Sequence, residues 1–153
     1  MSRIATRLAE LEIILPDAPA PVANYVPYVR TGSSVFISGQ VSLAPTGLIK
    51  GKLGDDMNIE DGQQAAHMCA VNLLAQLKAA CDGDLDRVKR VVKLGGFVNC
   101  TPDFTDHPRV INGASDLMVA VFGDAGKHAR AAVGAPALPL GAAVEVDGVF
   151  EVS

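Results

Sequence analysis

The sequence predicts an α+β domain in which a mixed β-sheet carries two helices packed on one face. The first observation is a length of 153 residues with a hydrophobic fraction of 49%, which suits one domain with its own core. The second is the order of patterns: strand patterns precede a long helical pattern, and a strand, a second helix and two strands follow. We therefore expect a single domain over residues 1–153.

The N-terminal part is expected to hold a helix and then two strands. Apolar residues recur at helical spacing over residues 3–12. Three prolines then predict an extended loop: Pro16, Pro19 and Pro21. Strand patterns over residues 26–30 and 35–38 flank a turn at 31–34. Gly39 interrupts the strand pattern, which predicts a β-bulge or a close approach of another group to the backbone.

The central part is expected to form a long helix and a long strand. The helix is rich in Ala and Leu, starts at a cap formed by Asn58 or Asp61, and runs up to Gly83. Residues 88–98 follow as an apolar strand pattern. The Gly95-Gly96 pair within this strand is expected to kink it, because glycine weakens a strand interior.

The C-terminal part is expected to consist of a second helix and a hairpin. Helical spacing covers residues 104–122, and Pro108 stands near the start, where its missing N–H does no harm. Residues 130–134 and 143–152 form two strand patterns, which we interpret as a hairpin closed by a tight turn. Two helices would then cover one face of the sheet and leave the other free to pack against neighbouring subunits.

The composition indicates which binding partners and which cellular compartment to expect. A mean hydropathy of +0.27 is high for a small protein and predicts that apolar surface is buried between subunits. The net charge of −4 disfavours nucleic-acid binding. Cys69, Cys81 and Cys100 lack metal or redox spacing and fit a reducing compartment. Without a membrane-length apolar run or a signal-peptide pattern, we expect a cytoplasmic protein that needs no metal or cofactor.

Two charged residues stand out in the apolar C-terminal part. Arg130 and Glu145 are surrounded by Ala, Val, Gly and Pro, and a charge in such surroundings must be paired or must await a ligand. The planar fork of arginine matches a carboxylate in two parallel hydrogen bonds. Glutamate can accept and return a proton. The pattern indicates a small site for a carboxylate-bearing molecule with acid/base chemistry beside it.

Three motifs give the chain a resemblance to a known family. Ser38-Gly39-Gln40 after a strand, Ala129-Arg130 entering a strand, and Leu138-Pro139 followed by Val144-Glu145 together resemble the Rid (YjgF) family. That family comprises reactive enamine/imine intermediate deaminases and is often labelled endoribonuclease L-PSP. The resemblance covers residues 25–149 and leaves residues 1–22 as an N-terminal extension. It implies a chorismate-mutase-like fold and a homotrimer with a site in each cleft between subunits.

The resemblance also implies roles for single residues. Arg130 would clamp the substrate carboxylate, and Glu145 would position or activate the attacking water. Further residues expected to bind the substrate are Tyr25, Ser38, Gly39, Asn112 and Ala132. The sequence departs from the family pattern at three positions: His128 replaces a proline before the Ala-Arg pair, Ala132 a common cysteine, and Pro136 a small or basic residue.

Simpler interpretations exist for the same residues. Arg130 could pair with a surface carboxylate, Glu145 could only hold Arg130 in place, and Tyr25 could be packing at the rim of the sheet. His128 adjoins Arg130, but we expect strand alternation to aim it at the opposite face. His67 and His107 are expected at the surface. No cysteine has a histidine beside it in the sequence, so a thiol nucleophile is not expected.

Three functions follow from this sequence. The first is a deaminase that hydrolyses a 2-imino acid, or its enamine tautomer, to a 2-oxo acid and ammonia. In it, the Gly39 N–H and the Ala132 carbonyl would help to orient substrate and water. The second is a trimeric protein that binds a small carboxylate for regulation without turnover. The third is an endoribonuclease, against which the acidic charge balance counts.

Overall fold

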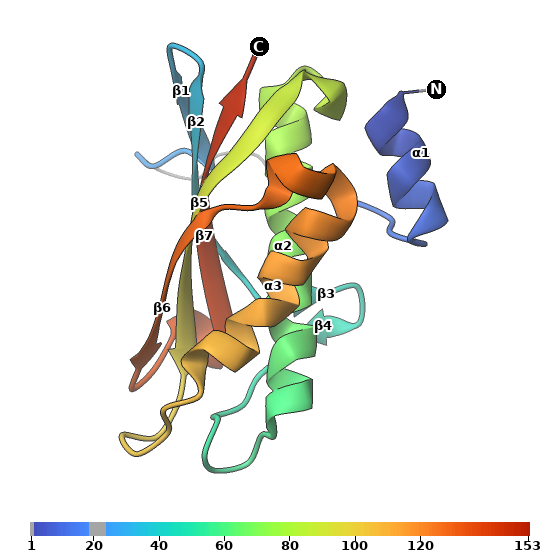
Figure 1. The fold of residues 1–153 in the computed structure, drawn as a ribbon. Helices are drawn as coiled ribbons and strands as arrows, with labels where there is room; N and C mark the ends of the chain where they lie inside the picture. Colours follow the sequence, from blue (N-terminus) through green and yellow to red (C-terminus); the bar gives the residue numbers. More distant parts are fainter. Residues whose placement is uncertain (1, 19–23) are drawn as a thin grey trace.

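The computed structural model describes residues 2–18 and 24–153, so Pro19 and Pro21 of the predicted loop lie outside the described residues. A five-stranded sheet in the order β1-β2-β7-β5-β6 carries helices on one face (Figure 1). The elements are α1 (Arg3–Glu10), β1 (Tyr28–Thr31), β2 (Ser34–Val41), β3 (Leu43–Ala44), β4 (Gly47–Leu48), α2 (Ile59–Ala80), β5 (Val88–Asn99), α3 (His107–Phe122), β6 (Ala129–Ala135) and β7 (Val144–Val152). The predicted α+β class with a mixed sheet is confirmed, because β5 pairs with β6 in parallel and with β7 antiparallel.

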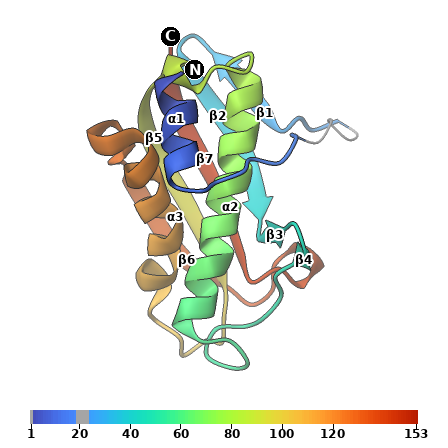
Figure 2. The same ribbon diagram turned by 90° about the vertical axis from the view of Figure 1, so that its right-hand side faces the viewer.

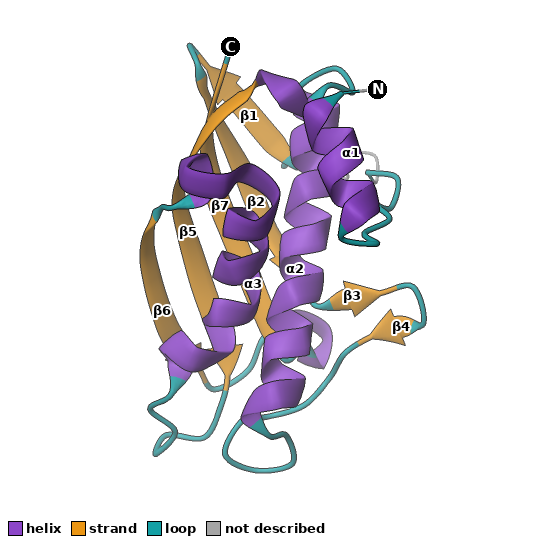
Figure 3. Cartoon of the chain, turned by 45° about the vertical axis from the view of Figure 1, so that its right-hand side comes forward, coloured by secondary structure: helices purple, strands orange, loops and turns teal. Residues whose placement is uncertain are grey.

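The two long helices lie side by side over the sheet (Figure 3). The predicted cap of α2 is confirmed, because the Asn58 side chain accepts a hydrogen bond from the backbone N–H of Asp61. The second helix, α3, begins at His107 and not at residue 104. Pro108 occupies its first turn, as predicted, and Asp106 stands at its N-cap position.

The helix predicted over residues 3–12 is confirmed as α1, and it adds a third helix to a layer that was expected to hold two. Its Ile4 and Leu8 are buried in the main core. The carboxylate of Asp86 accepts hydrogen bonds from the backbone N–H groups of Arg3 and Ile4, which ties the start of α1 to the loop before β5. Figure 2 shows α1 in front of the α2–α3 layer near one end. The first part of the N-terminal extension is therefore integrated into the fold.

The two glycine predictions for the strands have opposite outcomes. The pairing of β2 with β7 shifts register between Ile37 and Gln40, so the predicted bulge at Gly39 is confirmed. The predicted kink at Gly95-Gly96 is wrong, because the pairing of β5 with β7 runs through both residues without a shift. Gly96 instead admits Ile111 of α3, since a Cβ there would lie 2.6 Å from the Ile111 side chain. Close packing of helix on sheet explains this glycine.

The predicted C-terminal hairpin is wrong. Strand β6 is a sheet edge that pairs with β5, and β5 separates it from β7. The connection contains a short 3₁₀ turn, Pro139–Gly141, and carries the chain past the end of β5. Neighbouring strand patterns favoured a hairpin locally, but the third strand that intervenes comes from a distant part of the sequence. Sequence adjacency could not reveal it.

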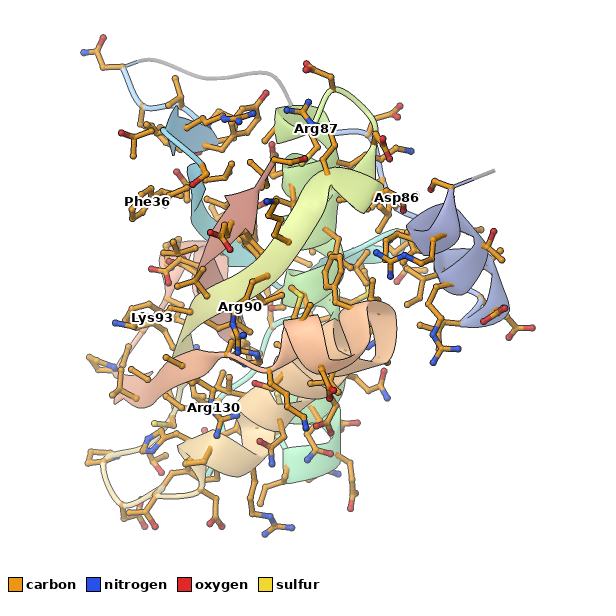
Figure 4. The ribbon with its side chains drawn as sticks, turned by 45° about the horizontal axis from the view of Figure 1, so that its top comes forward. Phe36, Asp86, Arg87, Arg90, Lys93 and Arg130 are labelled. Carbon is orange, nitrogen blue, oxygen red and sulfur yellow. The ribbon has the colours of Figure 1, made fainter. Side chains whose placement is uncertain are left out.

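The face of the sheet away from the helices carries apolar side chains that remain accessible. Val29, Phe36 and Val133 are about half exposed there. Phe36 is 47% exposed and pairs in register with Val149 of β7. Figure 4 shows Phe36 and Lys93 projecting from the sheet on this face. Within the described residues, no helix combines the length and the apolar character that crossing a membrane requires.

Candidate functional site

Arg130 is held at the edge of the sheet by helix α3. It lies on β6 opposite the buried Leu94, so its side chain starts on the helix face of the sheet. Its Nη1 donates hydrogen bonds to Asn112 Oδ1 at 2.8 Å and to Ser115 Oγ at 3.2 Å. Figure 4 shows the side chain between β6 and α3. Because Asn112 and Ser115 are three residues apart, they share one face of α3.

The guanidinium of Arg130 has neutral partners only. The ion pairs among the described residues join other side chains, so the alternative of a surface carboxylate partner finds no support there. Among the described residues, the hydrogen bonds of the Arg130 side chain all use Nη1. The Nε and Nη2 donors are the pair that can grip a carboxylate in a fork. The half-buried Arg130 is thus oriented without being neutralised.

His128 and Ser115 extend this network, and sequence reasoning missed both roles. The Nδ1 of His128 lies 2.6 Å from the Gly126 carbonyl, and its Nε2 lies 2.9 Å from Ser115 Oγ. A carbonyl can only accept, so Nδ1 carries a proton, and in the neutral ring Nε2 accepts from the serine hydroxyl. The expectation that His128 faces away from Arg130 is wrong. Residues 128 and 130 are two apart, and strand alternation puts them on the same side.

A second group of predicted site residues gathers around the bulge of β2. The Ser38 hydroxyl donates to the Val26 carbonyl at 2.8 Å, and the Ser38 N–H donates to the Pro27 carbonyl. These bonds fix the segment that presents Tyr25, which is 65% exposed. Gly39 lies directly against Glu145, since a Cβ on Gly39 would come within 2.5 Å of Glu145 Oε2. Any side chain at position 39 would therefore displace this carboxylate.

A cavity of about 340 Å³ opens beside this second group. Tyr25 and Gly39 line it together with Asn72 and Gln76 of α2. Gln76 is buried, and its Oε1 has no hydrogen-bond partner in the described part of the chain. The helical pattern predicted these two amides only as helix residues. Their position under the β2 bulge depends on long-range packing.

The pKa of the Glu145 carboxyl lies above the usual value of a glutamate. Burial raises its pKa, and the negative charge of Asp147 on the same strand raises it further. Burial likewise raises the pKa of Asp147, while the backbone N–H of Gly95 and the positive charge of Lys93 act against this. Residues 145 and 147 share the face of the sheet away from the helices. Glu145 therefore lies close to a second carboxylate and holds a proton more readily than an exposed glutamate.

The two groups of predicted residues do not meet within one chain. Arg130, Asn112 and Ala132 lie on the helix side of edge strand β6, where Ala132 pairs with Gly96. Glu145 is flanked by the buried Val144 and Val146, so it points to the opposite face. Strand β5 also separates β6 from β7, which adds about 10 Å across the sheet. The alternative that Glu145 holds Arg130 in place is therefore excluded within the chain.

The pH dependence of Glu145 gives a first prediction. Asp147→Asn removes the charge that opposes ionisation of Glu145, so the pKa of Glu145 should fall. The carboxylate form would then persist to lower pH, and the acidic limb of any activity that needs this form should move the same way. Titration of the Glu145 carboxyl carbon by NMR measures the shift directly. An unchanged titration midpoint would show that the two carboxyls do not interact.

Comparisons with known proteins agree with this architecture. The family model described as "YjgF/chorismate mutase-like, putative endoribonuclease" matches residues 5–151. Protein TCP17 of Trypanosoma cruzi is 50% identical over 153 residues, which cover 99% of this chain and 95% of TCP17. A 2-iminobutanoate/2-iminopropanoate deaminase of Dermatophagoides farinae is 27% identical over 139 residues, covering 90% of this chain and 92% of the deaminase.

A solved structure gives the same result. The crystal structure of the protein Atu1372 from Agrobacterium tumefaciens, described as having unknown function, superimposes with a TM-score of 0.91 and 46% sequence identity. The match covers 98% of this chain and 92% of Atu1372. Matches of this extent confirm the resemblance that the sequence motifs indicated. The chain belongs to the YjgF (Rid) family.

Proposed function

We propose that this protein is an imine/enamine deaminase, which hydrolyses 2-imino acids or their enamine tautomers to 2-oxo acids and ammonia. The observation that carries the proposal is the Arg130 guanidinium, oriented by Asn112 and Ser115 and lacking an acidic partner among the described residues. Such a group suits the carboxylate that every 2-imino acid carries. A relative named 2-iminobutanoate/2-iminopropanoate deaminase supports the same reaction class.

The reaction requires water to add to the C=N bond. Glu145 takes a proton from water as the oxygen attacks the imine carbon, and it then delivers this proton to the nitrogen, so that a carbinolamine forms. Collapse of this intermediate breaks the C–N bond, releases ammonia and leaves the 2-oxo acid. Since imines are already labile, orientation by Arg130 and modest acid/base help from Glu145 are sufficient. No cofactor enters the scheme.

The two residues act together when they come from different subunits. Arg130 lies at the β6 edge and Glu145 on the open sheet face. A second copy of the chain is therefore needed to place a Glu145 carboxylate beside the substrate that Arg130 holds. The exposed apolar side chains on the open face suit burial against such a copy. A closed homotrimer would repeat this contact and create three equivalent sites. Tyr25, Ser38 and Gly39 would then enter each site with Glu145, and Ala132 with Arg130.

A regulatory protein that binds a small carboxylate is the second candidate. One observation favours it: the hydrogen bonds that orient Arg130 come from α3 and are independent of Glu145. Carboxylate binding could therefore persist without proton transfer. The two candidates differ in their dependence on Glu145.

The experiment that tests the proposal is ammonia release from freshly generated 2-imino acids, with and without the protein. The deaminase predicts faster release at catalytic protein concentrations and the same final amount of ammonia. A release rate equal to spontaneous hydrolysis would reject turnover. Binding of a 2-oxo acid, measured by calorimetry on the same sample, would then support the regulatory alternative.

A further inference from the structure

A second cavity lies where the C-terminal ends of β5 and β6 meet the loop that leads into α3. Its volume is about 410 Å³, and its lining includes Cys100, Phe104, His107, Gly134 and Pro136. None of these residues belongs to the network around Arg130. Gly134 lies four residues beyond Arg130 on β6, which corresponds to about 13 Å along the strand. The cavity is therefore separate from the proposed carboxylate clamp.

A thiol and an imidazole meet in this cavity. Cys100 Sγ lies 3.4 Å from His107 Nε2, which is within range of a sulfur hydrogen bond. The ring of His107 is fixed by an edge-on contact with Phe104, with the ring centroids 5.5 Å apart. The sequence prediction placed His107 at the surface, whereas the start of α3 turns it toward Cys100 at the end of β5. This pair was not predicted.

Glycine at position 134 makes the contact geometrically possible. A Cβ there would lie 2.6 Å from both Cys100 Sγ and His107 Nε2. The ammonium of Lys52 holds the opposite wall by donating to Asn99 Oδ1 and to the Pro136 carbonyl. The thiol, its potential base and the cavity wall are therefore all positioned by defined contacts.

The protonation state of the thiol determines how it can react. Burial raises the pKa of Cys100, while the backbone N–H of Ala135 and the positive charge of Lys52 act in the opposite direction. The resting group is thus a neutral thiol and needs a base to react. His107 Nε2 is placed to accept that proton when Nδ1 carries the ring N–H.

We propose that Cys100 and His107 form a covalent modification site for small, uncharged α,β-unsaturated carbonyl compounds. The lining by Pro102, Phe104 and Pro136 suits a compact ligand without charge. A conjugate acceptor also suits a neutral thiol, because addition has no leaving group to expel. The site is independent of the deaminase reaction and of the residues assigned to it.

The addition is balanced without an oxidant or reductant. The S–H bond breaks as its proton moves to His107 Nε2, and the sulfur electron pair forms a C–S bond with the β-carbon of the acceptor. The electrons of the C=C bond move toward the carbonyl and give an enolate. His107 then returns the proton to the α-carbon, so the net change is addition of S–H across the double bond.

Acrylamide is a suitable probe, and peptide mass spectrometry locates its adducts. In the native protein, Cys100 should be labelled at least about tenfold faster than Cys69 and Cys81, which are fully buried and serve as internal references. His107→Gln should slow labelling of Cys100 roughly a hundredfold, which is within the range of general-base catalysis. Gly134→Ala should also slow it, because the added methyl group separates sulfur from nitrogen.

The reference cysteines, Cys69 and Cys81, distinguish a specific effect on Cys100 labelling from unfolding of the variant. If a variant merely unfolds, labelling of Cys69 and Cys81 rises, and the other variant then decides the question. Labelling of Cys100 no faster than the reference cysteines in the wild-type protein would overturn the proposal. Equal Cys100 rates in wild type and in a folded His107→Gln variant would remove the imidazole from the site.

Discussion

Glu145→Gln is expected to lower ammonia release from 2-imino acids by roughly 10²–10⁴-fold. The substitution keeps the shape of the side chain and a hydrogen-bonding group but removes the proton acceptor. Glu145 also holds a raised pKa through burial and Asp147, which brings it closer to the range in which a carboxyl can exchange protons near neutrality. Steady-state ammonia release at fixed substrate concentration provides the measurement.

Binding provides the control for this variant. A 2-oxo acid held by Arg130 should bind the Gln variant with nearly wild-type affinity, because the hydrogen bonds that orient the clamp come from Asn112 and Ser115. Affinity could rise slightly, since a nearby negative charge that repels the ligand is gone. Deamination within a few-fold of wild type would show that Glu145 handles no proton, and the regulatory alternative would gain support.

Arg130→Ala is expected to weaken binding of 2-oxo acids by a factor of about thirty or more. Removal of a charge-assisted, fork-like partner costs about 2–5 kcal/mol in buried settings. Arg130→Lys should restore little affinity, because an ammonium cannot reproduce the planar fork or keep the same contacts to Asn112 and Ser115. Isothermal calorimetry with a small 2-oxo acid measures both variants.

Arg109 lies on α3, the helix that orients Arg130, and provides a matched control for charge. Arg109 is exposed and pairs only with Asp106 in the described ion pairs, so Arg109→Ala removes the same charge without touching the clamp. Its affinity should stay within about twofold of wild type, because exposed charges are strongly screened. Equal losses in the Arg109 and Arg130 variants would indicate a general electrostatic effect and not a specific site.

Local signals in the sequence identified much of the fold. The Asn58 cap, the α2 helix and the bulge at Gly39 each depend on short-range chemistry, and each is confirmed. The hairpin failed because the partner of β6 is β5, a strand that precedes it by a whole helix. The function of Gly96 was missed for a related reason, since its neighbour Ile111 comes from α3. Long-range pairing is the information that local patterns lack.

The candidate site likewise has features that the sequence could indicate and features that depend on long-range packing. Sequence motifs identified Arg130 and Glu145, but they could not indicate that the two residues face opposite sides of the sheet. His128 and Ser115 had a usable signal. His128 has the same strand parity as Arg130, and Ser115 follows Asn112 at helical spacing. The Cys100–His107 contact had none, because it joins the residue after β5 to the first residue of α3, which only the path of the connecting loop brings together.

Mixed oligomers test directly whether the site is shared between subunits. Arg130→Ala and Glu145→Gln chains, each inactive alone, are co-expressed with different tags and purified as mixed assemblies whose mass is checked by light scattering. In every mixed trimer, one site of the three combines an intact Arg130 of one subunit with an intact Glu145 of another, which is roughly a third of the sites. We expect the mixed assemblies to recover about a third of the wild-type rate of ammonia release. A mixed assembly as inactive as either parent would contradict it.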